Sequence, residues 1–296
     1  NKRIKYNYMD IEIQKQIIKN TEDLRYLHNY PTYPPYHEGA YIEEYFFNFF
    51  IDNLDKFSKG ERYFLPIWWT DLYIGNKHKD GSIQKYLDSL DKSLKYFTVT
   101  QHDNAIQENY DIDLLHYSAG GKFGDKWLPL VCSPIKNPQS QPRDIFASFV
   151  GTLSHKRQVM FQPLTSQPNK YVIGGRGFWR AEIPKSEEQQ FMDIMSRSIF
   201  ALCPRGFGAT SFRMYEAMQF GTIPVYISDK HCLPWDDELN WDEFCVIVSP
   251  QQVPQLDTIL GKFTQEEIQT MSNKVKELYP QYFSLEGMSN NILKRI

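Results

Sequence analysis

The pattern of apolar and polar residues becomes regular in the second half of the chain. Between residues 144 and 249, short apolar runs alternate with stretches whose apolar residues recur at helical spacing. Short apolar runs bounded by turn residues are typical of buried strands, and a spacing of three to four residues is typical of amphipathic helices. Strands that alternate with helices in this way predict βαβ units around a parallel sheet. We therefore expect an α/β fold.

The same pattern gives approximate positions for the elements. In the second half we expect strands at 144–151, 171–175, 199–204, 222–228 and 244–249, and helices at 154–164, 186–198, 210–220 and 264–283. In the first half we expect helices at 9–20 and in the aromatic stretch that ends near residue 54, and strands at 61–69 and 95–103. Thr264 has a side chain suited to capping the last of these helices.

A polar stretch separates the two halves. Residues 132–144 are rich in Pro, Ser, Asn and Gln, the composition of a linker. A length of 296 residues suits two domains of ordinary size. We predict an N-terminal domain at 1–135, a C-terminal domain at 136–270, and a terminal helix at 271–296 that packs back on the N-terminal domain.

Composition excludes several classes of function. The net charge of −3 leaves no broad basic surface for nucleic acid. The four cysteines form no CxxC pair, so we expect reduced thiols and no zinc site. No apolar run approaches the roughly 18 residues that a membrane span needs, and the start of the chain lacks a signal peptide. These features lead us to expect a soluble, cytoplasmic protein.

One loop in the second half carries the chemistry of an anion site. The predicted strand 199–204 is followed by Arg205 and Gly206, and a helix is expected to begin near Ser211. A helix N-terminus attracts anions, and Gly206 allows the backbone to approach a ligand closely. Arg205 and Arg213 add charge-assisted contacts to phosphate oxygens, and Glu216 lies one turn beyond Arg213. This arrangement suggests a nucleoside diphosphate site, although spacing alone equally allows an Arg213–Glu216 surface pair beside plain turn glycines.

A series of short motifs over residues 198–249 resembles the exostosin-like glycosyltransferases, glycosyltransferase family 47. The family pattern is matched, in order, by Cys203-Pro204-Arg205-Gly206, Ser211-Phe212-Arg213, Glu216-Ala217, Gly221-Thr222-Ile223-Pro224-Val225, Ser228-Asp229, Leu233-Pro234 and Trp241-Asp242-Glu243-Phe244. Glu216 stands where many relatives have Asp. Weaker similarities upstream include a segment leading to Arg157, a strand closely followed by Asp71, and a strand ending in His102 and Asp103.

The resemblance implies a GT-B architecture, in which two Rossmann-like domains face each other across a cleft. The N-terminal domain would bind a glycan acceptor, and the C-terminal domain would bind a nucleotide-sugar donor. The implied reaction is inverting transfer of a sugar from a UDP-sugar to a hydroxyl of an oligosaccharide, without a required cofactor or metal. UDP-xylose is the donor we expect first. The chain looks most like stand-alone members from microbes or large algal viruses, which would place it in the host cytoplasm if it is viral.

The resemblance also implies roles for particular residues. The donor diphosphate would be bound by two arginines and a helix N-terminus, and Glu216 would hold the ribose; the donor-binding candidates are Arg157, Arg205, Gly206, Thr210, Ser211, Arg213 and Glu216. For Arg157, a solvated helix arginine is an equally good interpretation.

Inverting transfer needs a base on the acceptor side. Asp71 is the first candidate, because it follows an apolar run that we interpret as a strand; a helix cap or turn is its structural alternative. His102 and Asp103 form the second candidate.

Two alternatives remain open. Asp111 and Asp113 spell the D-x-D metal motif of GT-A enzymes, but the motifs downstream favour a turn or helix cap there. A catalytically inactive glycan-binding or scaffolding protein with the same fold would also retain most of the motifs.

Overall fold

A computed structural model describes residues 8–25, 40–135, 138, 141–178 and 183–296. Residues 136, 137, 139 and 140 of the predicted linker lie outside these ranges. The described residues fall into two compact units: the first contains those up to 128 together with 285–296, and the second those from 129 to 284. Within the described ranges, every helix is too short or too polar to traverse a lipid bilayer.

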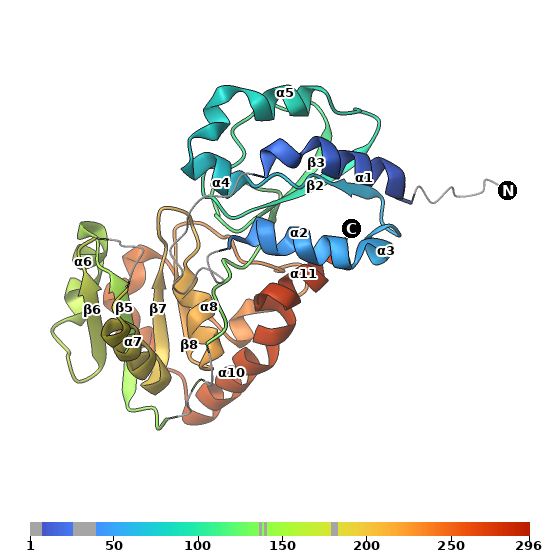
Figure 1. The fold of residues 1–296 in the computed structure, drawn as a ribbon. Coiled ribbons are helices and arrows are strands. Elements are labelled where there is room, and N and C mark those ends of the chain that lie inside the picture. Colours follow the sequence, from blue (N-terminus) through green and yellow to red (C-terminus); the bar gives the residue numbers. More distant parts are fainter. Residues whose placement is uncertain (1–7, 26–39, 136–137, 139–140, 179–182) are drawn as a thin grey trace. The chain divides into compact units, whose positions relative to one another are not determined.

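The first unit is built on a parallel four-stranded sheet with the order β1-β2-β3-β4 (Figure 1). Its elements are α1 (Ile11–Asn20), a 3-10 turn (Glu22–Leu24), α2 (Ile42–Asp52), α3 (Leu54–Phe57), β1 (Arg62–Phe64), α4 (Trp69–Ile74), a 3-10 turn (Lys77–Asp80), α5 (Ser82–Asp88), β2 (Lys95–Thr100), β3 (Asp113–Ser118), β4 (Lys126–Trp127) and α11 (Leu285–Leu293). Helix α11 packs beside α2, and α2 packs on β2.

Aromatic side chains form the core between α2 and this sheet. Phe46 and Phe50 lie one turn apart on the buried face of α2 and are fully buried. The Phe46 ring meets the Phe64 ring edge-on at 5.1 Å, and Phe64 stacks on Phe97 of β2 at 5.1 Å. Burying rings of this size contributes most of the stability available to such a small sheet.

The strand predicted at 61–69 is shorter than expected. Strand β1 ends at Phe64, one further ladder bond runs from the Leu65 N–H to Phe97, and Pro66 then offers no N–H to continue the ladder. Trp69 begins α4, and its indole N–H donates to Thr98 Oγ1 at 2.9 Å inside the core. Trp69 is fully buried.

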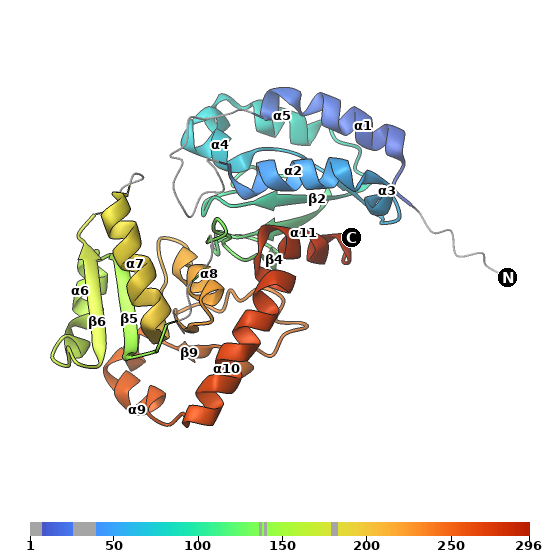
Figure 2. The same ribbon diagram turned by 60° about the horizontal axis from the view of Figure 1, so that its bottom comes forward.

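The second unit is built on a parallel five-stranded sheet with the order β6-β5-β7-β8-β9. Its elements are β5 (Ile145–Thr152), α6 (His155–Phe161), a 3-10 turn (Gln162–Leu164), β6 (Tyr171–Arg176), α7 (Lys185–Arg197), β7 (Ser198–Pro204), α8 (Phe212–Gln219), β8 (Ile223–Ile227), a 3-10 turn (Trp241–Glu243), β9 (Val246–Val248), a 3-10 segment (Pro250–Gln255), α9 (Leu256–Leu260), α10 (Gln265–Leu278) and a π-helical turn (Tyr279–Phe283). Helix α7 packs against β5, as Figure 2 shows, and against β7. Helix α8 packs against β7 and β8, and α10 packs against β8.

These observations confirm the α/β class and the parallel sheets. Two expected helix starts are also confirmed. Ser211 caps α8 by accepting the Arg213 N–H at 3.3 Å, and Thr264 forms a capping box with Glu267 at the start of α10. Both caps satisfy backbone donors that would otherwise lack a partner.

Candidate functional site

The predicted donor-binding residues gather at the carboxyl edge of the second sheet. Strands β5, β7 and β8 are parallel and end there, at Thr152, Pro204 and Ile227. The candidates lie on α6, on the loop between β7 and α8, and on the first two turns of α8. Ligands of open parallel sheets bind beyond this edge.

Arg213 is held in place on three sides. Its Nη1 donates to Glu216 Oε2 at 2.7 Å, and its guanidinium carbon lies 4.2 Å from the centroid of the Phe191 ring on α7. A β-carbon added to Gly151, near the end of β5, would lie 2.9 Å from Nη2. The Arg213 side chain is only 15% exposed, and its Nε is buried without a hydrogen-bond partner among the described residues. The pair with Glu216 is therefore largely buried rather than a surface pair.

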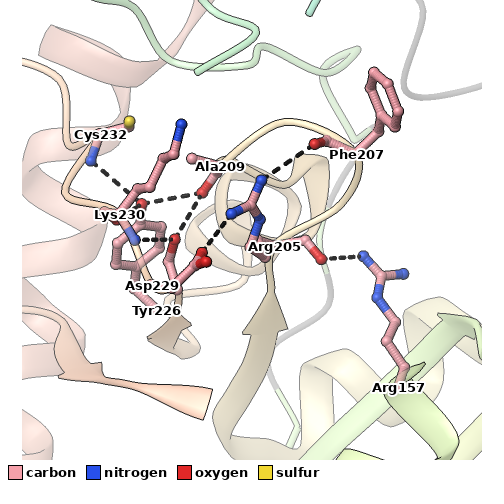
Figure 3. Close-up of polar contacts among 9 residues, drawn as sticks. Arg157, Arg205, Phe207, Ala209, Tyr226, Asp229, Lys230 and Cys232 are labelled. Carbon is pink, nitrogen blue, oxygen red and sulfur yellow. Dashed lines mark hydrogen bonds and ion pairs between the residues drawn. The ribbon is translucent and has the colours of Figure 1, made fainter. Parts of the chain in front are cut away.

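The guanidinium of Arg157 donates hydrogen bonds to backbone carbonyls. Nη1 donates to Thr152 at 2.9 Å, and Nη2 donates to Pro204 at 3.1 Å and to Arg205 at 3.0 Å. Arg157 thus ties the end of β5 to the end of β7. Figure 3 shows its bond to the Arg205 carbonyl. Burial, and secondarily repulsion from Arg213, lower the pKa of Arg157. Two cations that repel each other in a partly buried place favour a neighbouring anion.

Arg205 is engaged by its own loop. Its guanidinium forms an ion pair with Asp229, just after β8, and donates to the carbonyl of Phe207 at 3.2 Å (Figure 3). The ring of Phe207 points away from this network and is 67% exposed. In this structure Arg205 therefore shapes the loop through Asp229, and it would have to share its charge with any phosphate.

The remaining donor-binding candidates form the turn between β7 and α8. The N–H of Gly206 donates to the carbonyl of Thr210 at 3.3 Å, which closes the loop. Thr210 is buried, whereas Gly206 is exposed and leaves backbone accessible beside Arg157. Ser211 is occupied as the cap of α8. The group as a whole places a helix N-terminus and two partly buried guanidiniums around a glycine-lined edge, an arrangement that suits a phosphate.

The candidate bases all lie in the first unit. Asp71 was expected directly after a strand, but it lies in the first turn of α4, seven residues beyond the end of β1, and is 1% exposed. His102 and Asp103 follow β2 and are both partly exposed. Among the three, Asp71 is the one that a substrate could not touch without a change in its surroundings.

His102 has a neighbour on its ring nitrogen. The N–H of Asn104 donates to Nδ1 of His102 at 3.2 Å. Burial, followed by repulsion from His78 and Lys122, lowers the pKa of His102, so the ring favours the neutral form. A neutral ring that accepts at Nδ1 carries its proton on Nε2 and acts there as a donor. Asp103, the other member of this pair, is partly exposed.

Sequence reasoning overlooked Glu43. Its carboxyl group is buried, and Oε1 accepts hydrogen bonds from Thr70 and Gln101, the residues just before Asp71 and His102. Burial raises the pKa of Glu43. A signal was available, because Glu43 lies three residues before Phe46 on the apolar face of the aromatic helix, where a charged residue is unusual.

The D-x-D motif is divided between two surface ion pairs. Asp111 accepts from Lys92 Nζ at 2.8 Å, and Asp113, the first residue of β3, accepts from Arg62 Nη1 at 2.7 Å. In the described part of the chain, no group of three or more His, Cys, Asp or Glu side chains is arranged to hold a metal ion.

Comparison with known proteins adds the family. The model of the exostosin GT47 domain matches residues 77–263, more than half of the chain. The chain belongs to the exostosin GT47 family. The matched stretch includes the donor-binding candidates in the second unit and the His102–Asp103 loop in the first.

Curated relatives of this GT47 chain include several plant proteins. A rice protein named "Probable glucuronosyltransferase GUT1" is 35% identical over 161 residues, which cover 49% of this chain and 37% of the rice protein. The Arabidopsis thaliana protein named "Probable beta-1,4-xylosyltransferase IRX10" is 35% identical over 141 residues, 44% of this chain and 32% of that protein. The matched stretch thus spans about a third of the length of these relatives.

Solved structures similar to this GT47 chain include TarM and the pneumococcal O-GlcNAc transferase GtfA in complex with UDP and GlcNAc. TarM aligns over 71% of this chain and 57% of its own, with a TM-score of 0.38 and 11% identity. GtfA aligns over 72% of this chain and 58% of its own, with a TM-score of 0.37 and 11% identity.

Proposed function

We propose that this chain is an inverting glycosyltransferase that moves a sugar from a UDP-sugar to a hydroxyl of a glycan acceptor. The observation that carries the proposal is the convergence of Arg157, Arg213 and the N-terminus of α8 at the carboxyl edge of the second sheet. Membership of the GT47 family supports the same reaction class. No cofactor is required by this scheme, because the UDP-sugar is itself the activated substrate.

In this scheme the second unit binds the donor. The diphosphate would lie against the guanidiniums of Arg157 and Arg213 and the backbone of the loop 204–211. Arg205, which lies in this loop, would add a further positive charge. Glu216, one turn along α8, would accept hydrogen bonds from the ribose hydroxyls. As the bond from the anomeric carbon to the diphosphate oxygen breaks, negative charge develops on the leaving group, and fixed positive groups stabilise it more strongly than they stabilise the intact donor.

The first unit would supply the base. The acceptor oxygen forms a bond to the anomeric carbon as its proton passes to a carboxylate, and a single displacement inverts the configuration. Partial exposure favours Asp103 over the buried Asp71, although side chains at such sites often adjust when substrate binds. His102 would then act as a neighbouring hydrogen-bond donor.

The identity of the donor sugar is proposed from the names of the relatives. One relative carries a xylosyltransferase name and several carry glucuronosyltransferase names. We propose UDP-xylose as the first donor, with UDP-glucuronic acid as the comparison.

The proposal is tested by incubating the protein with a panel of nucleotide sugars, with and without oligosaccharide acceptors, and following released UDP. We expect turnover with a UDP-sugar that increases when a suitable acceptor is present, and NMR of the product should show inversion at the anomeric carbon. Binding of glycans without turnover of any donor would instead support the inactive glycan-binding alternative.

A further inference from the structure

Glu43 joins two loops that are far apart in sequence. Its Oε1 accepts the N–H of Thr70 at 3.0 Å, the hydroxyl of Thr70 at 2.6 Å and the N–H of Gln101 at 3.0 Å. In return, the side-chain oxygen of Gln101 accepts the N–H of Ile42 at 3.0 Å. The first turn of α2, the start of α4 and the end of β2 are therefore linked by reciprocal hydrogen bonds.

These hydrogen bonds lie next to the candidate bases in the sequence. Thr70 directly precedes Asp71, and Gln101 directly precedes His102, which is followed by Asp103. One carboxyl oxygen thus fixes the backbone beside every candidate base in the first unit. Whichever of them removes the acceptor's proton, Glu43 bonds to the backbone one or two residues before it.

The carboxyl group is costly where it lies. Glu43 is 2% exposed, and among the described residues nothing donates a hydrogen bond to its Oε2. Burying a carboxyl with one unpartnered oxygen opposes folding, and the raised pKa of Glu43 reflects the same cost. An apolar residue, in keeping with Phe46 on the same face, would avoid this cost but would leave two buried N–H groups without an acceptor.

We propose that Glu43 is a positioning residue that holds the Asp71 loop and the His102–Asp103 loop in one fixed geometry for proton removal. The inference rests on the proposed function for its catalytic meaning. Small displacements of a reacting group lower rates steeply, so loosening either loop should reduce turnover more than it reduces donor binding.

The experiment compares Glu43→Ala, Glu43→Gln and a control, Gln14→Leu. Gln14 is also fully buried and bonds backbone, since its amide donates to the Phe64 carbonyl and accepts the Phe64 N–H, but it is not bonded to either loop. Hydrogen exchange by mass spectrometry is measured for peptides covering 68–73 and 101–104. Turnover of donor with acceptor is measured below the melting temperature of every variant.

We expect Glu43→Ala to accelerate exchange in both peptides together and to lower kcat by about 10- to 100-fold, with the KM for the donor nearly unchanged. Glu43→Gln keeps an acceptor oxygen and should recover most of the rate. Gln14→Leu should lower the melting temperature without either effect. If Glu43→Ala does not fold, Thr70→Val, which removes only the hydroxyl bond, should show smaller changes of the same kind.

Two outcomes would overturn the inference. One is unchanged exchange in both peptides for Glu43→Ala, or for Thr70→Val if only that variant folds. The other is a kcat no lower than that of Gln14→Leu. Absence of turnover in the wild-type protein would overturn the proposed function instead, and the exchange comparison would still decide whether Glu43 holds the two loops.

Discussion

Gly151 leaves the space that the guanidinium of Arg213 occupies. A β-carbon at this position would lie 2.9 Å from Nη2 of Arg213 and 3.3 Å from Cζ of Phe149. Because real β-carbons do not approach neighbouring atoms so closely as the first distance, a side chain at Gly151 would move the guanidinium. The glycine at position 151 of β5 therefore helps to determine where the Arg213 guanidinium lies.

Gly151→Ala should weaken UDP binding by about tenfold or more, corresponding to ~1.4 kcal/mol. The added methyl group meets the movable end of an arginine, so the free energy of unfolding should change by less than about 1 kcal/mol. Gly174→Ala on the neighbouring strand β6 is the matched control, since a β-carbon there meets nothing within 4 Å. Equal UDP affinity in the two variants would show that the position of Arg213 does not matter for binding.

Asp103→Asn should abolish sugar transfer while UDP binding stays near wild type, because the amide keeps the shape of the carboxyl but cannot take up the proton. General-base removal of a proton is worth about 10²- to 10⁴-fold in rate. The same measurements on Asp71→Asn and His102→Gln complete the test. If Asp71→Asn is inactive and Asp103→Asn keeps full transfer, then the buried carboxylate is the base and the accessible one is not.

Transfer should survive an excess of EDTA. Arg157, Arg213 and the N-terminus of α8 provide positive charge for the leaving diphosphate, and Asp111 and Asp113 are each occupied by a basic side chain. Released UDP is measured with and without chelator. Loss of activity in EDTA that manganese restores would require a metal in the mechanism and would return attention to the two aspartates.

Stability should fall as the pH drops from 6.5 towards 4 because of His116. Burial lowers the pKa of His116 to about 4 in the folded chain, against 6.5 for an exposed imidazole. Between these values the unfolded chain takes up a proton that the folded chain excludes, so acid favours unfolding, by at most about 3 kcal/mol from this group. Urea unfolding across this range should be less dependent on pH in His116→Gln, and an unchanged dependence would contradict the assignment.

Periodicity was sufficient to predict much of the second unit. Short apolar runs gave the parallel strands, and the side chains of Ser211 and Thr264 marked helix starts because capping is a local interaction. The run at 61–69 was misleading, since strand and helix segments can both be continuously apolar when buried. Pro66 within that run was the local sign that the strand would end early.

The partners of the charged residues could not be predicted in the same way. Arg205 pairs with Asp229, 24 positions away, and Glu43 bonds to Gln101, 58 positions away. Both contacts depend on how strands and loops are arranged in the tertiary structure, and the spacing of residues in the sequence does not predict that arrangement. The sequence motifs could therefore indicate which residues are candidates, but not which of their donors and acceptors are already occupied.

The central claim, that the second unit binds a nucleoside diphosphate through Arg213, is tested most directly by calorimetric titration of UDP into wild-type protein, Arg213→Ala and Arg197→Ala. Arg197 is a matched control from the same unit, because it forms surface ion pairs with Asp144 and Asp193 away from the loop. We predict binding to wild type and Arg197→Ala with similar affinity, and binding to a folded Arg213→Ala that is weaker by at least about tenfold, since a charge-assisted hydrogen bond contributes roughly 1.5–3 kcal/mol. No UDP binding to the wild-type protein at millimolar concentration, or equal affinity in all three proteins, would contradict the account.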